Sequence, residues 1–119
     1  MRVLVVDDDD GIRFIVGGVA QELPGAVVEM ASNGADALER IDRTGCPELI
    51  VTDVRMPRMN GLELTRAAKN RCSSLRVIVL AASDYRSEAF AAGCDDYLSK
   101  PFELDVLSQK IESLLGRAD

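Results

Sequence analysis

Five aspartates of this chain follow two apolar segments that have the character of buried strands. Residues 7–10 are all aspartate and come directly after the apolar residues 3–6, and Asp53 ends a second such run. If the two runs are neighbouring parallel strands, their carboxyl ends lie side by side, where open α/β sheets bind ligands. Asp7, Asp8 and Asp53 would then converge. Two carboxylates about 4 Å apart repel by roughly 4 kcal/mol at an effective dielectric constant of about 20, so the pocket needs protons, a basic group or a cation.

The available ligand atoms favour a hard cation. The chain has no histidine, and its three cysteines, Cys46, Cys72 and Cys94, are widely spaced without a CxxC pair. A site made only of oxygen atoms favours Mg²⁺, which we therefore expect here. The cysteine pattern indicates neither a zinc site nor a disulfide framework and predicts three reduced thiols. Without histidine, any phosphohistidine must belong to a partner.

Length and charge limit the classes of function. A chain of 119 residues is expected to form one domain over residues 1–119, because it is long enough for a core but too short for two. The net charge of −6 opposes direct binding to nucleic acid, which draws on clustered lysine and arginine. No run approaches the roughly 18 apolar residues of a membrane span, and the amino terminus lacks the features of a signal peptide. We expect a cytoplasmic protein.

Strand and helix patterns alternate along the chain. Apolar runs predict strands at residues 3–6, 27–31, 49–53, 77–80 and 96–98. Helical spacing predicts helices capped by Asp9 or Asp10, by Ser32 or Asn33, and by Asn60, then a short helix over about 85–92 and a last one over 104–114. Strands separated by helices form parallel, right-handed crossovers. The series predicts a doubly wound α/β sandwich, a flavodoxin-like (βα)₅ fold with a parallel five-stranded sheet in the order 2-1-3-4-5, in which the first and third strands are adjacent.

Four separated motifs resemble the receiver domain of two-component response regulators, and the resemblance covers essentially the whole chain. They are Val5-Val6-Asp7-Asp8, Val51-Thr52-Asp53-Val54-Arg55-Met56-Pro57, Asn60-Gly61 and Lys100-Pro101-Phe102. The resemblance implies that Asp53 accepts a phosphoryl group from a sensor histidine kinase or a phosphotransfer protein. It implies that Asp7, Asp8, Asp53 and the backbone carbonyl of Arg55 arrange Mg²⁺, and that Lys100 pairs with the phosphoryl oxygens. A downstream effector protein or domain would read the result, and the chain would catalyse only its own phosphorylation and dephosphorylation.

Phosphoryl transfer requires residues of these types. It needs an in-line nucleophile and neutralised charge, which a carboxylate, a divalent ion and an ammonium group supply. We expect Asp8 to contact the ion directly and Asp7 to do so partly through water, because Mg²⁺ keeps several waters. Lys100 would act as a mobile point charge. The resemblance also suggests a cis peptide bond between Lys100 and Pro101.

One position departs from the family pattern. Strand four of a receiver usually ends in Thr or Ser followed by Ala, whereas this chain has Ala81, which cannot donate the hydrogen bond that couples the phosphoryl group to an aromatic residue on strand five, here Tyr97. Such a bond contributes about 1.5–3 kcal/mol, comparable with typical allosteric couplings of about 1–3 kcal/mol. We therefore expect Asp53 to be phosphorylatable but weakly coupled to the face between strand four and helix five. Ser83 replaces the hydroxyl only if the strand end shifts by two residues, and Arg55 and Ser83 are expected to tune dephosphorylation.

Two other functions stay open beside the leading one. A degenerate receiver that binds partners without phosphorylation is favoured by Ala81 and opposed by the intact acidic and lysine motifs. A small phosphohydrolase is suggested by Asp8-Asp9-Asp10-Gly11, which resembles the DxDG start of haloacid-dehalogenase-type enzymes, although Ile12 replaces their usual Thr. The leading interpretation is a phosphoacceptor signalling domain, either free-standing or cut from a longer regulator.

Overall fold

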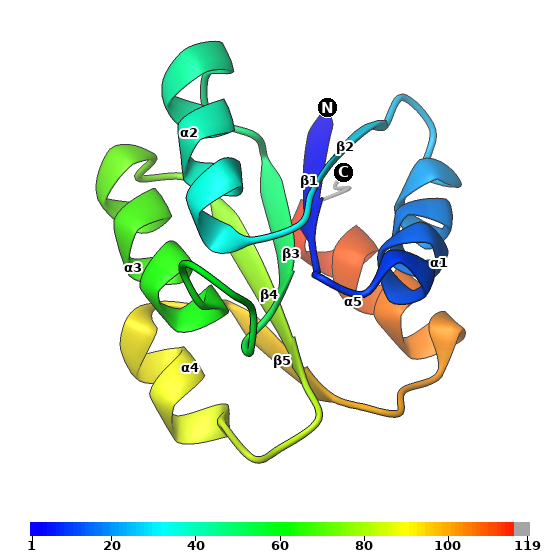
Figure 1. The fold of residues 1–119 in the computed structure, drawn as a ribbon. Coiled ribbons are helices and arrows are strands. Elements are labelled where there is room, and N and C mark those ends of the chain that lie inside the picture. The colour runs from blue at the N-terminus through cyan, green and yellow to red at the C-terminus, as the bar shows by residue number, and fades with distance from the viewer. Residues whose placement is uncertain (116–119) are drawn as a thin grey trace.

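A five-stranded parallel sheet lies between two layers of helices in the computed structural model, which describes residues 1–115 (Figure 1). The elements are β1 (Arg2–Val6), α1 (Asp10–Gln21), β2 (Val27–Ala31), α2 (Gly34–Thr44), β3 (Leu49–Asp53), α3 (Gly61–Arg71), β4 (Arg76–Ala81), α4 (Arg86–Ala92), β5 (Asp96–Ser99) and α5 (Leu104–Leu115). The strand order β2-β1-β3-β4-β5 confirms the predicted doubly wound fold. Among the residues described, none of the helices combines the length and apolar character needed to cross a membrane.

Two clusters of buried side chains, one on each face of the sheet, hold the layers together. Val3 and Val5 of β1 belong to the cluster that includes α1 and α5, whereas Leu4 and Val6 belong to the cluster that includes α2, α3 and α4. Figure 1 shows the same division of the helices about the sheet. Successive residues of a strand point to opposite faces, so a strand covered on both sides must be apolar throughout. This requirement explains the unbroken apolar runs that mark the central strands.

Side-chain caps fix the starts of the helices next to the acidic edge of the sheet. The Asp9 carboxylate accepts a hydrogen bond from the Ile12 amide at 3.0 Å, and the Asn33 side chain accepts one from the Asp36 amide at 2.8 Å. Asn60 caps α3 in the same way and forms a reciprocal capping box with Glu63. The structure therefore selects Asp9 and Asn33 from the alternatives that the sequence left open.

Several strands are slightly longer than predicted because backbone pairing continues through polar residues. Arg2 pairs with Val27 at the start of β1, and Arg76 pairs with Leu49 at the start of β4. At the other end, Ser99 extends β5 beside Ala81. The helix α4 begins one residue later than expected. A hydropathy pattern depends only on side chains, so it does not predict these terminal backbone pairs.

The prediction of three reduced thiols is wrong for two of them. Cys46 and Cys72 form a disulfide with Cα atoms 5.9 Å apart, and Cys94 is free and buried. Cys46 precedes β3, and Cys72 follows α3. The strand and the helix of a βα unit run in opposite directions, so its two ends meet at the same edge of the sheet although 26 residues separate the cysteines. Spacing along the sequence does not reveal this proximity.

Gly61 permits the close contact between α3 and the end of β3. A Cβ atom at this position would overlap the carbonyl oxygen of Asp53. The Gly61 amide also donates a hydrogen bond to the Val54 carbonyl at 2.8 Å, which fixes the start of α3 against the loop. The absence of a side chain at residue 61 therefore helps to position Asp53.

Replacing Gly61 by alanine should destabilise the fold. We expect Gly61→Ala to lower the free energy of unfolding by about 1–3 kcal/mol or more, because the methyl group forces backbone shifts in a packed region. Gly18→Ala is the matched control, since a Cβ there meets nothing within 4 Å and α1 should gain up to about 1 kcal/mol. Urea unfolding measures both changes. A Gly61→Ala variant as stable as the wild type would contradict the expected clash.

Candidate functional site

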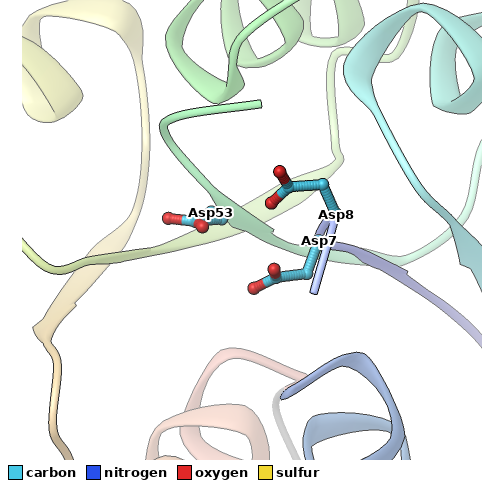
Figure 2. A group of neighbouring side chains, drawn as sticks. All are labelled: Asp7, Asp8 and Asp53. Carbon is cyan, nitrogen blue, oxygen red and sulfur yellow. The ribbon is translucent and has the colours of Figure 1, made fainter. Parts of the chain in front are cut away.

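Three carboxylates converge at the carboxyl edge of the sheet, where the sequence predicted them (Figure 2). Asp7 and Asp8 follow β1, and Asp53 is the last residue of β3. One carboxylate oxygen of each lies within 4.8 Å of the others. The convergence follows from the sheet order, because β1 and β3 are paired in parallel with Val6 opposite Thr52. Figure 2 shows the three side chains directed toward a common space beyond the strand ends.

Lys100 brings a positive charge into this cluster. Its Nζ atom lies 3.1 Å from Oδ2 of Asp53 and 3.3 Å from Oδ2 of Asp7. The backbone amide of Lys100 donates a hydrogen bond to the Ala81 carbonyl at 2.8 Å, which ties the residue to the end of β4. The peptide bond between Lys100 and Pro101 is cis, as the resemblance suggested. Four side chains predicted from sequence therefore meet at one place.

Hydrogen bonds orient the two less exposed carboxylates. Oδ1 of Asp7 accepts a hydrogen bond from the Asp9 amide at 2.9 Å. The guanidinium of Arg13 donates to the backbone carbonyl of Asp7 at 2.6 Å. Oδ1 of Asp53 accepts the Val54 amide at 2.7 Å. Asp7 is only 2% exposed, whereas Asp8 is exposed to solvent. The cluster thus has a buried, fixed side and a side that solutes can reach.

The charges of the cluster are unbalanced. Burial raises the pKa of Asp7, and repulsion from Asp53 acts in the same direction, although the Asp9 amide and Lys100 oppose it. Burial by itself lowers the pKa of Lys100, but attraction and hydrogen bonding from Asp7 and Asp53 outweigh burial, so its pKa is raised. Lys100 therefore remains charged at neutral pH, and its single positive charge faces three carboxyl groups.

The cluster fits a hard divalent cation. Its ligand atoms are carboxylate oxygens, which Mg²⁺ prefers. Asp8 and Arg55 line one surface depression together with Val54, Met56 and Asn60, so the exposed carboxylate opens toward the loop whose carbonyl was predicted to take part. Asp7, Asp8 and Asp53 are the residues that could hold such an ion. A bound cation would supply the positive charge that Lys100 alone does not.

Ala81 adjoins the site through the Lys100 amide, and both Ala81 and Tyr97 belong to the buried core. Ala81 is the last residue of β4 and is buried, and Ser83 lies in the exposed loop that follows. The Tyr97 side chain is 2% exposed, and its hydroxyl donates to the Ser83 carbonyl at 2.9 Å and accepts the Tyr85 amide at 2.8 Å. Arg86 lies over the Tyr97 ring, 4.9 Å from its centroid. Tyr97 is therefore fixed to the loop between β4 and α4.

The sequence analysis missed two arginines that support these residues. Arg13 binds the Asp7 carbonyl and forms an ion pair with Asp10. Its position three residues after Asp10 on a helix is a spacing that favours such a pair, so the sequence carried a signal. Arg86 stacks on Tyr97, and no sequence pattern indicated this contact, because it depends on the path of the loop after β4.

Known proteins with similar sequences are response regulators. The family model described as the response regulator receiver domain matches residues 3–112. Response regulator MprA of Mycobacterium leprae is 42% identical over 120 residues, which cover 98% of this chain and 52% of that protein. MprA of Mycobacterium ulcerans is 43% identical over 122 residues, covering 98% of this chain and 51% of its own length. The chain thus spans about half the length of the curated relatives it matches.

Solved receiver domains have the same fold. The BeF3-activated receiver domain of DrrB has a TM-score of 0.87 and 33% sequence identity, with 98% of this chain and 97% of that chain covered. A CheY-like receiver domain protein from Methanospirillum hungatei has a TM-score of 0.88 and 27% identity, with 96% and 92% covered. Sequence, strand order and motif positions agree, and we conclude that this chain belongs to the response regulator receiver domain family, whose members are signalling domains of two-component systems.

Proposed function

We propose that this domain accepts a phosphoryl group on Asp53, in the cytoplasm, from the phosphohistidine of a sensor histidine kinase or a phosphotransfer protein. The proposal includes Mg²⁺ bound by Asp7, Asp8 and Asp53, with the backbone carbonyl of Arg55 contributing. The observation that carries it is the position of Asp53, whose carboxylate lies within reach of two other carboxylates and 3.1 Å from the Lys100 ammonium. This arrangement combines a nucleophile with positive charge at one sheet edge.

The side chains divide the work of phosphoryl transfer. The Val54 amide holds Oδ1 of Asp53, and Oδ2 faces Lys100. In the transfer, a bond forms between an Asp53 oxygen and phosphorus while the bond from phosphorus to the partner's histidine nitrogen breaks, and the electron pair stays on that nitrogen. Lys100 neutralises charge on the phosphoryl oxygens, where a preorganised ammonium group contributes most. A bound Mg²⁺ would add further charge neutralisation at these oxygens.

The surface beside Lys100 supports a protein as the phosphoryl donor. An apolar groove there is lined by residues of α1 and of the segment around Pro101, including Ile15, Phe102 and Leu104. Phe14, which directly precedes Ile15 on α1, is 77% exposed. Exposed apolar side chains gathered at a site mark protein interaction surfaces more often than free surface. A partner seated on this groove would bring its phosphohistidine close to Asp53.

The switching step is proposed to be weak. Ala81 has no hydroxyl that could bind the phosphoryl group, and Tyr97 already has both hydroxyl hydrogen bonds satisfied by the loop backbone. A phosphoryl group on Asp53 would therefore lack the donor that draws the end of β4 and this loop toward it. Recognition of the phosphorylated domain by a downstream effector protein or domain would then depend on contacts near Asp53 itself.

Ala81 also favours the second candidate, a receiver that binds partners without phosphorylation. The two functions differ in whether Asp53 takes a phosphoryl group at all. The phosphohydrolase interpretation gains no support, since Asp10, its second required aspartate, pairs with Arg13 and its side chain is 89% exposed. Family membership points away from a classical enzyme as well. Labelling of Asp53 separates the remaining candidates.

Phosphodonor labelling tests the leading function. Wild type incubated with acetyl phosphate and Mg²⁺ should gain one base-labile phosphate, and Asp53→Asn should gain none, because the amide is not a nucleophile for this reaction. Asp10→Asn is the matched control, since Asp10 lies at the same edge outside the cluster. Chelation of the metal should suppress labelling of the wild type. Intact mass and phosphate release measure the result. Label that persists in Asp53→Asn would place the acceptor elsewhere, and an unlabelled wild type would favour the second candidate.

The unbalanced charges predict a stability change on removing Asp7. Because burial raises the pKa of Asp7 in the folded state, ionised Asp7 destabilises the fold at neutral pH, and this effect fades as the pH falls through that raised pKa. Asp7→Asn should therefore have a larger free energy of unfolding than the wild type at pH near 7 without divalent cation, and the difference should shrink in acid. Urea unfolding at several pH values measures it. A less stable Asp7→Asn variant at neutral pH would contradict this account.

Mg²⁺ should stabilise the wild type in the same assay. A ligand that binds only the folded state adds about 2.7 kcal/mol when its concentration is about 100 times Kd. Asp7→Asn should gain much less at the same Mg²⁺ concentration, and Asp10→Asn should gain as much as the wild type. Equal stabilisation of wild type and Asp7→Asn would remove Asp7 from the proposed metal ligands.

Weak switching is testable with a phosphoryl mimic. On saturation with BeF₃⁻ and Mg²⁺, backbone amide shifts of the wild type should be confined to the neighbourhood of Asp53 and be small around Tyr97. Ala81→Thr restores a hydroxyl and should enlarge the shifts around Tyr97, whereas Ser83→Ala should not change them. Nuclear magnetic resonance measures all three proteins. Large two-state shifts around Tyr97 in the wild type would refute weak coupling.

A further inference from the structure

The disulfide encloses the part of the chain that presents Asp53. Cys46 lies shortly before β3 and Cys72 directly follows α3, so the covalent ring contains β3, the loop after Asp53 and α3. Asp53 lies at the carboxyl end of β3, whereas the disulfide lies at the opposite edge of the sheet. The covalent ring therefore includes Asp53, but the two cysteines themselves lie away from the acidic cluster.

Contacts other than the disulfide hold Cys46 in place. The Arg2 guanidinium donates hydrogen bonds to the carbonyls of Thr44, Gly45 and Cys46 at 3.3, 3.3 and 3.4 Å. The next residue, Pro47, is buried and restricts Cys46 to extended backbone conformations. The loop that carries Cys46 is thus fixed against β1.

Cys72 is held on the opposite side of the bond. Its amide donates to the Ala68 carbonyl at 2.9 Å and so caps the end of α3. Beside it, Nε of Arg71 lies 2.7 Å from Oδ1 of Asp42, which ties the ends of α2 and α3 together. With both backbones anchored, the two sulfur atoms can bond without a rearrangement of the fold.

The three cysteines differ in access. Cys46 is exposed, whereas Cys72 is 5% exposed and Cys94 is 6% exposed. Burial raises the pKa of Cys94 to about 11, with Asp95 and Asp96 acting in the same direction, so this thiol remains protonated at neutral pH. Exchange with a small reagent requires a thiolate that solvent can reach, and Cys46 is the one exposed cysteine of the three. A small reagent can therefore react only at Cys46.

We propose that Cys46 and Cys72 are a reversible redox pair that closes a covalent ring around the βα unit carrying Asp53. In the oxidising direction, the Cys46 thiolate attacks a low-molecular-weight disulfide such as oxidised glutathione, which releases one small thiol and leaves a mixed disulfide on Cys46. The Cys72 thiolate then attacks the Cys46 sulfur and releases the second small thiol. The protein thiols are oxidised, the small disulfide is reduced, and the two protons end on the released thiols. A reduced small thiol reverses both steps.

Ring closure has a measurable consequence for the fold. A crosslink between cysteines 26 residues apart restricts the unfolded chain, which should raise the melting temperature on the order of 10 °C. Amide hydrogen exchange in β3 and α3 should also become slower in the oxidised form, because the unit can no longer separate at that end. These readouts do not involve phosphorylation, so the redox proposal and the phosphoacceptor proposal can fail independently.

Thiol exchange tests the assignment of the pair. After incubation with oxidised glutathione, wild type and the control Cys94→Ala should each lose two hydrogen atoms of mass and give a peptide that links residues 46 and 72. Cys72→Ala should retain one glutathione on Cys46, and Cys46→Ser should retain none, because Cys72 is buried. Mass spectrometry distinguishes these products. A stable glutathione adduct on the wild type, a link to Cys94 or a link between two chains would overturn the proposal.

Thermal unfolding tests the effect of the ring. Oxidised wild type should melt on the order of 10 °C above the reduced protein. Cys94→Ala should keep this difference, and Cys46→Ser should melt at one temperature with or without reductant. Oxidised and reduced wild type with equal melting temperatures would overturn the stabilising role of the ring.

Discussion

The pairing of β1 with β3 is the constraint on which the site depends. This pairing places the carboxyl ends of both strands side by side, and it holds because both strands are apolar on their two faces and are covered by helices. The pairing therefore brings Asp7, Asp8 and Asp53 close together. Their mutual repulsion is tolerated because the buried apolar contacts of the strands stabilise the same arrangement. The acidic cluster is therefore a consequence of the sheet order.

Lys100 links this cluster to the other half of the sheet. Its ammonium contacts Asp7 and Asp53, while its backbone is bound to Ala81 at the end of β4. The positive charge of the proposed phosphoryl site and the strand end proposed to take part in switching thus meet at one residue. The proposed phosphoryl transfer would use the lysine side chain, whereas switching would require a hydroxyl that Ala81 lacks. The two properties can therefore be lost or retained separately, and the proposed redox pair acts at the opposite edge from both.

The sequence by itself determined the fold class and the acidic cluster. Apolar runs and helical spacing are periodic, local signals, and parallel crossovers restrict the strand order to few possibilities. The sequence alone therefore predicts that an aspartate at the end of an apolar run lies at the carboxyl edge of the sheet. The expectation of Mg²⁺ came from the oxygen ligands, and the roles of Asp53 and Lys100 came from motif resemblance. All three stay predictions until labelling and metal binding are measured.

Tertiary structure alone decided which side chains meet when no local pattern relates them. It paired Cys46 with Cys72 against the prediction of reduced thiols, selected Asp9 as the helix cap, and joined the Tyr97 hydroxyl to the loop after β4. Each outcome depends on distances between segments far apart in sequence, or on the exact turn with which a helix starts. Hydrophobic periodicity sets which face of an element is buried, but it does not fix these distances, because they follow from how whole elements pack.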